Sequence, residues 1–174
     1  MNGVTIRAAV PDDAESIATI HADSVIGERG RGDYDDEQID AWAHAHTPAQ
    51  LRERIGPRLF FIAEGVAGAV GYAQLDVDEA IVRSIYVAAD QQRGGLGMQL
   101  GRTVLAVAAE TGLSALELDS SLNAVPFYER LGFERLGGVD HRFRNGTVMA
   151  CVRMARKIVD ERESKMLTNA EALS

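Results

Sequence analysis

Residues 84–98 carry the feature that most constrains the fold. They begin as an apolar strand and end in a loop with three glycines, Gly94, Gly95 and Gly97, directly before the apolar spacing of a helix. In the first turn of a helix the backbone N–H groups have no carbonyl partner, and they lie at the positive end of the helix dipole. Such a loop is typical of phosphate binding. We therefore expect a strand, an anion-binding loop and a helix in succession, with a ligand that carries phosphate.

The composition narrows the class of protein. The 174 residues, 46% hydrophobic and 25% charged, are typical of one ordinary globular domain. The net charge of −8 argues against non-specific nucleic-acid binding. Cys151 is the only cysteine, which excludes an internal disulfide and fits the cytoplasm. No apolar run reaches the roughly 18 residues of a membrane span, so we expect a cytoplasmic protein with no membrane or nucleic-acid partner.

Before the loop, apolar spacing predicts helices first and strands afterwards. Asp12 followed three residues later by Glu15 has the spacing of a capping box at the first helix. A glycine-rich, charged loop follows over residues 27–36. The expected helices span residues 11–25, 36–45 and 47–56, and the expected strands span residues 4–9, 59–63, 69–77 and 79–87, the last two as a hairpin.

After the loop the pattern predicts a helix from Leu96 to about residue 111, and then a strand over residues 113–119 parallel to the strand before the loop. Asn123 is expected to cap a short helix that ends at Gly132 in a left-handed conformation. The closing strands are expected over residues 133–136, 138–143 and 147–154. The order is mixed α/β, with a domain over residues 1–158 and a polar tail over residues 159–174.

Two other phosphate-binding loops fit less well. A Walker loop needs Lys followed by Ser or Thr after its last glycine, whereas Met98 and Gln99 follow Gly97. The second alternative is the dinucleotide-binding fingerprint, which the glycines at 95, 97 and 101 resemble. In this chain acidic residues follow about 20 positions later, as that fingerprint requires. However, residues 88–94 separate the strand from the glycines, and the loop comes after the middle of the chain. An NAD(P)-dependent oxidoreductase is therefore the weaker alternative.

A third loop matches better. Gln92-Arg93-Gly94-Gly95-Leu96-Gly97 resembles the Gln/Arg-x-x-Gly-x-Gly/Ala loop of the GNAT superfamily of acetyl-CoA-dependent N-acetyltransferases. Residues 85–87 resemble its fourth strand, and residues 121–133 resemble its second cofactor motif. The two motifs have the expected separation, and the element order extends the likeness from Val4 to Lys157. The N-terminal half is similar to bacterial stand-alone members.

This resemblance implies an α+β fold with a mixed central sheet, splayed between strands 4 and 5 and covered by helices on both faces. Acetyl-CoA would lie in the gap as co-substrate, with no metal, and its acetyl group would move to a primary amine in a ternary complex. The residues implied in its binding are Ile85, Tyr86, Val87, Gln92, Arg93, Gly94, Gly95, Leu96, Gly97, Met98, Asn123 and Tyr128.

Tyr128 is the candidate acid for the leaving thiolate, because its ordinary pKa of about 10 lies near the thiol's value of about 8.5. The alternative is that Tyr128 only packs. Many relatives carry a glutamate near the position of Ile81, which is apolar here. The general base that would deprotonate the amine is left open. The candidates are Asp76, Glu79 and Asp119, and deprotonation through ordered water is the alternative.

The acceptor is expected between the first two helices. Tyr34 and Trp42 are candidates for its walls, and Asp119 is a further candidate contact. The acidic run at residues 33–37 could hold a cationic amine, a small molecule or a peptide, or could simply be a solvated helix start. The four histidines have no zinc spacing, so no metal is expected. A homodimer through an edge strand, and a non-catalytic acyl-CoA sensor, are open alternatives.

Overall fold

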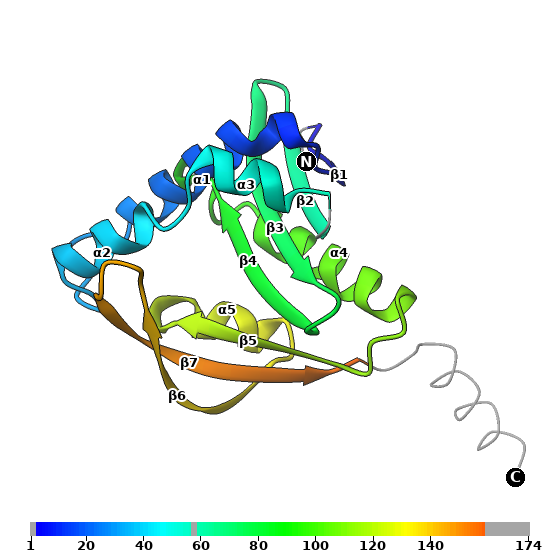
Figure 1. Cartoon of the computed structure of the whole chain (residues 1–174). Coiled ribbons are helices and arrows are strands. Elements are labelled where there is room, and N and C mark those ends of the chain that lie inside the picture. The colour runs from blue at the N-terminus through cyan, green and yellow to red at the C-terminus, as the bar shows by residue number, and fades with distance from the viewer. Residues whose placement is uncertain (1–2, 57–58, 159–174) are drawn as a thin grey trace, which may run out of the picture.

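The computed structural model describes residues 3–56 and 59–158 (Figure 1). The described strands form one sheet in the order β1-β2-β3-β4-β5-β7-β6. The helices are α1 (Ala14–Ile26), α2 (Asp36–Ala43), α3 (Pro48–Arg54), α4 (Leu96–Glu110) and α5 (Val125–Arg130). The strands are β1 (Thr5–Ala8), β2 (Leu59–Gly65), β3 (Gly68–Asp76), β4 (Ile81–Val87), β5 (Ala115–Ser121), β6 (Glu134–Arg142) and β7 (Val148–Lys157).

The sheet is mixed and opens at its centre. Every neighbouring pair is antiparallel except β4 and β5, which are parallel. In the described sheet these two strands share the single register pair Ile81–Glu117, beside which the Glu117 N–H donates to the Ala80 carbonyl over 3.0 Å. Further along, β4 and β5 diverge, as Figure 1 shows. The predicted splayed sheet is confirmed, and the parallel sheet of a dinucleotide-binding fold is not present among these strands.

Helices cover both faces of the sheet because successive strand residues point to opposite sides. In β3, Tyr72 packs with Ile17 of α1 and Leu51 of α3, whereas the next residue, Ala73, packs with Leu100 of α4. Apolar spacing in the sequence predicts an inward stripe of Leu96, Leu100, Val104, Val107 and Ala108 on α4. All of them are buried except Val107, which is partly buried against the same core. Burying each large side chain contributes about 1.5–3 kcal/mol. The predicted two-sided arrangement is confirmed.

A third cluster joins the N-terminal helices to the C-terminal hairpin. Ile39 and Trp42 of α2 are buried against Phe143, Met149 and Cys151. This cluster holds α2 over the β6–β7 hairpin and closes one end of the gap between β4 and β5.

The predicted helix starts are wrong in two places. The Asp12 and Glu15 capping box does not form; instead Asp13 accepts the Val10 N–H over 2.8 Å, and its carboxylate is held by Arg7 at 2.8 Å. Asn123 does not cap α5, which is preceded by a 3₁₀ turn, η3 (Leu122–Ala124), and has Ala124 at its N-cap with no side-chain bond.

The C-terminal part follows the prediction more closely. Gly132 ends α5 with φ +81°, and the Phe133 N–H donates back to the Tyr128 carbonyl over 3.0 Å, as a left-handed cap requires. The two strands predicted over residues 133–143 are one strand, β6, whose register shifts between Arg135 and Gly137. The predicted tail, residues 159–174, lies outside the described residues. Within residues 3–56 and 59–158, no helix is long and apolar enough to cross a membrane.

Candidate active site

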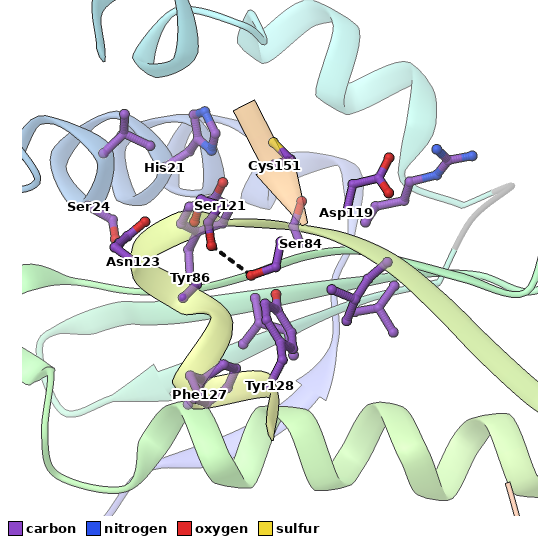
Figure 2. A pocket seen from close by; sticks show the side chains of 18 of the residues that line it. His21, Ser24, Ser84, Tyr86, Asp119, Ser121, Asn123, Phe127, Tyr128 and Cys151 are labelled. Carbon is purple, nitrogen blue, oxygen red and sulfur yellow. Dashed lines mark hydrogen bonds between the residues drawn. The ribbon is translucent and has the colours of Figure 1, made fainter. Parts of the chain in front are cut away.

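A cavity of about 990 Å³ occupies the gap between β4 and β5 (Figure 2). One part of its lining comes from β4, the loop before α4 and the start of α5. The other part comes from α1, α2 and β7, which contribute His21, Ser24, Trp42 and Cys151. A volume of this size suits a cofactor-sized ligand. The cavity therefore joins the two sequence motifs to the N-terminal helices.

The glycine loop has the backbone of an anion cradle. Arg93 and Gly95 have φ of +67° and +84°, and Gly95 is the N-cap of α4 with no side-chain cap bond. The Gln99 N–H donates to the Gly95 carbonyl over 3.1 Å, so the N–H groups of residues 96–98 precede the helical ladder. These donors at the positive end of a 15-residue helix suit phosphate oxygens.

Most predicted loop residues line the cavity. They are Gln92, Arg93, Gly95, Gly97 and Met98, whereas Gly94 and Leu96 are not among the lining residues and Leu96 is buried in the core. The side-chain amide of Gln92 donates to the Val87 carbonyl over 3.2 Å and so ties the loop to the end of β4.

Gly97 brings the two motifs together. A Cβ at this position would lie 3.2 Å from Cε2 of Phe127 and 3.8 Å from Cγ2 of Val87. Only a glycine lets the first turn of α4 approach the α5 ring and the β4 strand this closely. The residues of the cradle therefore fit a phosphate-bearing ligand that reaches from the loop to the β4 edge.

Ile85, Tyr86 and Val87 also line the cavity. Beyond Ile81 this side of β4 has no pairing strand among the described residues. An unpaired strand edge presents backbone N–H and C=O groups to whatever lies beside it. The edge can therefore hydrogen-bond an extended amide-containing ligand.

Tyr128 lies in the cavity wall. Figure 2 shows its side chain rising from α5 toward β4, and it is 8% exposed. The rings of Phe127 and Phe133 meet it edge-on at 5.0 and 5.9 Å. Within the described part of the chain its hydroxyl has no hydrogen-bond partner, and burial raises its pKa above the ordinary value of 10. The Tyr128 hydroxyl therefore stays protonated at neutral pH.

The other predicted contacts are placed differently. Trp42 and Asn123 line the cavity, and the Trp42 indole N–H donates to the Tyr86 hydroxyl over 2.9 Å. Tyr34 is not among the lining residues. Its hydroxyl accepts the Leu122 N–H over 2.7 Å and donates to the Ala150 carbonyl over 2.8 Å, which ties the loop before α2 to η3 and β7.

The carboxylates considered as bases are engaged by arginines. Asp119 lines the cavity but holds Arg153 through two bonds of 2.8 and 3.1 Å. Asp76 and Glu79 both contact Arg83, and neither is among the lining residues. Ile81 does line the cavity, so an apolar side chain stands at that position.

Sequence reasoning did not place many of the polar lining residues at the site, among them His21, Glu28, Gln74 and Ser84. Within the described residues, Oε2 of Glu28 and Nε2 of Gln74 are buried without a hydrogen-bond partner. The signal for His21 was its place in the apolar stripe of α1, beside Ile17 and Ile20 at helical spacing. A polar residue on such a face needs a buried partner.

Comparisons with known proteins agree with this geometry. The model of the acetyltransferase (GNAT) domain family matches residues 31–157. The chain is 26% identical over 134 residues to the uncharacterized N-acetyltransferase YafP of Escherichia coli (strain K12), covering 77% of this chain and 83% of that protein.

Solved structures share the fold. A GCN5-related N-acetyltransferase from Rhodopseudomonas palustris superposes with a TM-score of 0.82 at 27% identity, covering 90% of this chain and 97% of that one. A phosphinothricin acetyltransferase from Sinorhizobium meliloti, solved with acetyl-CoA, gives 0.68 at 20% identity over 89% and 88% of the two chains. The family match spans most of the 174 residues and includes both cofactor motifs. The chain therefore belongs to the GNAT family of acetyltransferases.

Proposed function

We propose that this protein moves an acetyl group from acetyl-CoA directly to a primary amine while both are bound. The observation that carries the proposal is the single cavity that runs from the α4 cradle past Tyr128 to the N-terminal helices. Such a cavity holds the two reactants side by side. It therefore lowers the entropic part of the activation barrier, because the reactants no longer have to be brought together during the reaction.

The cofactor would use the cradle and the β4 edge. The N–H groups of residues 96–98 would bind the pyrophosphate, with Arg93 as a nearby charge. The backbone of Ile85, Tyr86 and Val87 would bind the pantetheine amides, and Asn123 would add a side-chain amide. A β4 N–H aimed at the thioester carbonyl would stabilise the negative charge that develops on its oxygen. The acetyl-CoA complex of the phosphinothricin acetyltransferase from Sinorhizobium meliloti supports this choice of ligand.

Tyr128 would supply the acid. Its hydroxyl gives its proton to the sulfur as the carbon–sulfur bond breaks, and regains a proton from the new amide nitrogen. Burial keeps the hydroxyl protonated until that moment, because it raises the phenol pKa.

A covalent acetyl-enzyme is not needed. Cys151 lines the cavity, but burial raises the pKa of its thiol to about 11, so the nucleophilic thiolate is scarce at neutral pH. Direct attack by the amine is the simpler route. The acceptor would be a small molecule or a peptide that reaches the cavity past Trp42.

A thermal-shift experiment with acetyl-CoA, CoA, NAD and NADP tests the ligand. A ligand present at 100 times its dissociation constant adds about 2.7 kcal/mol of stability. The proposal expects a shift with acetyl-CoA and with CoA. A shift with neither would overturn it, whereas a shift without any thiol release across an amine screen would favour the non-catalytic sensor.

A further inference from the structure

The active-site cavity adjoins a second cavity of about 830 Å³ between α2, α3 and the turn that joins β6 to β7. The residues that line both cavities mark the junction between them, and they are Ala45, His46, Arg54, His141 and Phe143. His46, Arg54 and His141 are basic, and Arg142 and Arg144 follow them in the second cavity. In a chain of net charge −8, this basic junction is a local concentration of the opposite charge.

The carboxylates near the basic junction are engaged by other groups. Among the described residues, Glu37 and Asp40 line the second cavity. Glu37 accepts the Thr147 hydroxyl over 3.2 Å, and Asp40 holds Arg29, which lines neither cavity, at 2.6 Å. The carboxylates that line the active-site cavity do not extend into the lining of the second one; they are Glu28, Glu117 and Asp119. The junction therefore keeps a surplus of basic groups.

Arg54 and His46 form a pair at the basic junction. Nη1 of Arg54 lies 3.4 Å from Nδ1 of His46, and because a guanidinium only donates, Nδ1 is the acceptor. Burial, together with the basic groups around it, lowers the pKa of His46 to about 4, so its ring is neutral at pH 7 and carries its proton on Nε2. The pair therefore combines the positive charge of Arg54 with a neutral N–H donor.

Ring contacts connect the basic junction to β4. The His46 ring lies 5.5 Å from the His21 ring, which meets the Tyr86 ring edge-on at 4.8 Å. His21 is held between the Trp42 carbonyl at 2.8 Å and the Tyr72 hydroxyl at 3.2 Å. The junction thus lies two ring contacts from the strand edge proposed for the thioester, a distance that a small acceptor can span.

We propose that the acceptor is a primary amine that also carries a carboxylate, and that Arg54 and His46 bind this carboxylate at the basic junction, with Arg144 adding charge. This inference rests on the proposed acetyl transfer and names the substrate class of its acceptor. Arginine binds a carboxylate through two parallel N–H bonds, and such charge-assisted bonds are roughly twice as strong as neutral ones. The bound carboxylate offsets the repulsion among the basic groups and leaves the amino group toward β4.

The test compares amino acids with their own carboxamides as acceptors. Glycine, β-alanine, 4-aminobutyrate and leucine are each measured beside the amide, in which the negative charge alone is lost. In the best pair, kcat/KM from thiol release should be about tenfold or more higher for the acid, because a charged hydrogen bond is lost in the amide. The amine of an α-amino amide loses its proton more readily than that of the acid, so amine reactivity cannot produce this preference.

Two variants locate the carboxylate. Arg54→Gln should reduce the preference for the acid by about tenfold, mainly through a higher KM for the acid. Arg144→Gln, at an exposed position, should reduce it in the same direction. The matched control is Arg52→Gln, an exposed arginine of the same helix that lines neither cavity, and it should keep the wild-type preference. A retained thermal shift with acetyl-CoA shows that each variant is folded.

Salt gives an independent readout. Raising the ionic strength should raise the KM for the acid and leave the KM for its amide unchanged, because salt screens the attraction between charges.

Wild-type enzyme that acetylates the amides as well as the acids would overturn the carboxylate site, and so would a preference that Arg54→Gln and Arg144→Gln both retain. Acetylation of any amine in those cases still supports the proposed function. Bound acetyl-CoA with no acetylation of any acid, amide or simple amine would overturn the transfer and this inference together.

Discussion

Ile81 of β4 pairs with Glu117 of β5, and this is the register pair from which the two parallel strands separate. From there both strands run toward their carboxyl ends, β4 into the glycine loop and β5 into η3. Ligands in open sheets bind at such carboxyl ends. The placement of this one pair sets the length of open β4 edge that is left for the cofactor.

Replacing Tyr128 by Phe should lower kcat by about 10²-fold or more, because general acid catalysis typically supplies that much. The hydroxyl has no hydrogen bond among the described residues, so its loss leaves no buried group unpaired and the fold should tolerate it. Acetyl-CoA should still raise the melting temperature as in the wild type. Steady-state thiol release and thermal shift, measured together, check this; a wild-type kcat would rule out the acid role.

Gly95→Ala should weaken acetyl-CoA binding through the backbone. Gly95 has φ +84°, and no atom lies within 4 Å of an added Cβ. The substitution therefore strains the backbone conformation without creating a steric clash. A left-handed non-glycine residue costs roughly 1–2 kcal/mol. Titration calorimetry should show weaker binding as the loop relaxes. The control is Gly30→Ala, at φ +76° with the same open space but outside the cavity; an equal loss of affinity in both variants would contradict the cradle.

Tyr34→Phe should destabilise the fold by about 1–3 kcal/mol, because it leaves the Leu122 N–H and the Ala150 carbonyl without their partner. Burial raises the Tyr34 pKa to about 12, so its hydroxyl stays neutral and both bonds persist at neutral pH. Urea unfolding measures the change. An unaltered midpoint would show that these bonds contribute nothing to holding η3 beside β7.

Stability should fall as the pH drops from about 6.5 to about 4. The folded pKa of His46 is about 4, below the ordinary 6.5, so the unfolded chain binds more protons in this window. The contribution is fully present above pH 6.5 and is lost on acidification; His21, whose pKa is also lowered, acts in the same direction. His46→Asn should flatten the slope of unfolding free energy against pH, and a slope as steep as in the wild type would contradict this.

The parts of the fold predicted well are those that local sequence determines. The end of α5 could be predicted from Gly132, because residues other than glycine rarely adopt φ +81°. The glycine loop and the strand before it follow from residues close together in the chain. The fourth and fifth strands were expected to splay only through the family resemblance, which the register pair Ile81–Glu117 confirms.

The errors arise from contacts between distant residues. The chain enters α1 through a 3₁₀ turn over Pro11–Asp13, where the Asp13 carboxylate, held by Arg7 of β1, accepts the Val10 N–H, and α1 itself starts without a side-chain cap. Asn123 does not cap because β5 continues to Ser121 through its pairing with Cys151, and a 3₁₀ turn then precedes α5. The His21–Tyr72 bond joins residues 51 positions apart, so no local pattern could have predicted it.

The most direct test of the account is thiol release from acetyl-CoA in the presence of a panel of primary amines, with the acetylated product identified by mass spectrometry. The account predicts CoA release in equal amount to one acetylated amine, at a rate that Tyr128→Phe lowers while acetyl-CoA binding persists. Tight acetyl-CoA binding with no release for any amine would contradict acetyl transfer and leave an acyl-CoA-binding protein.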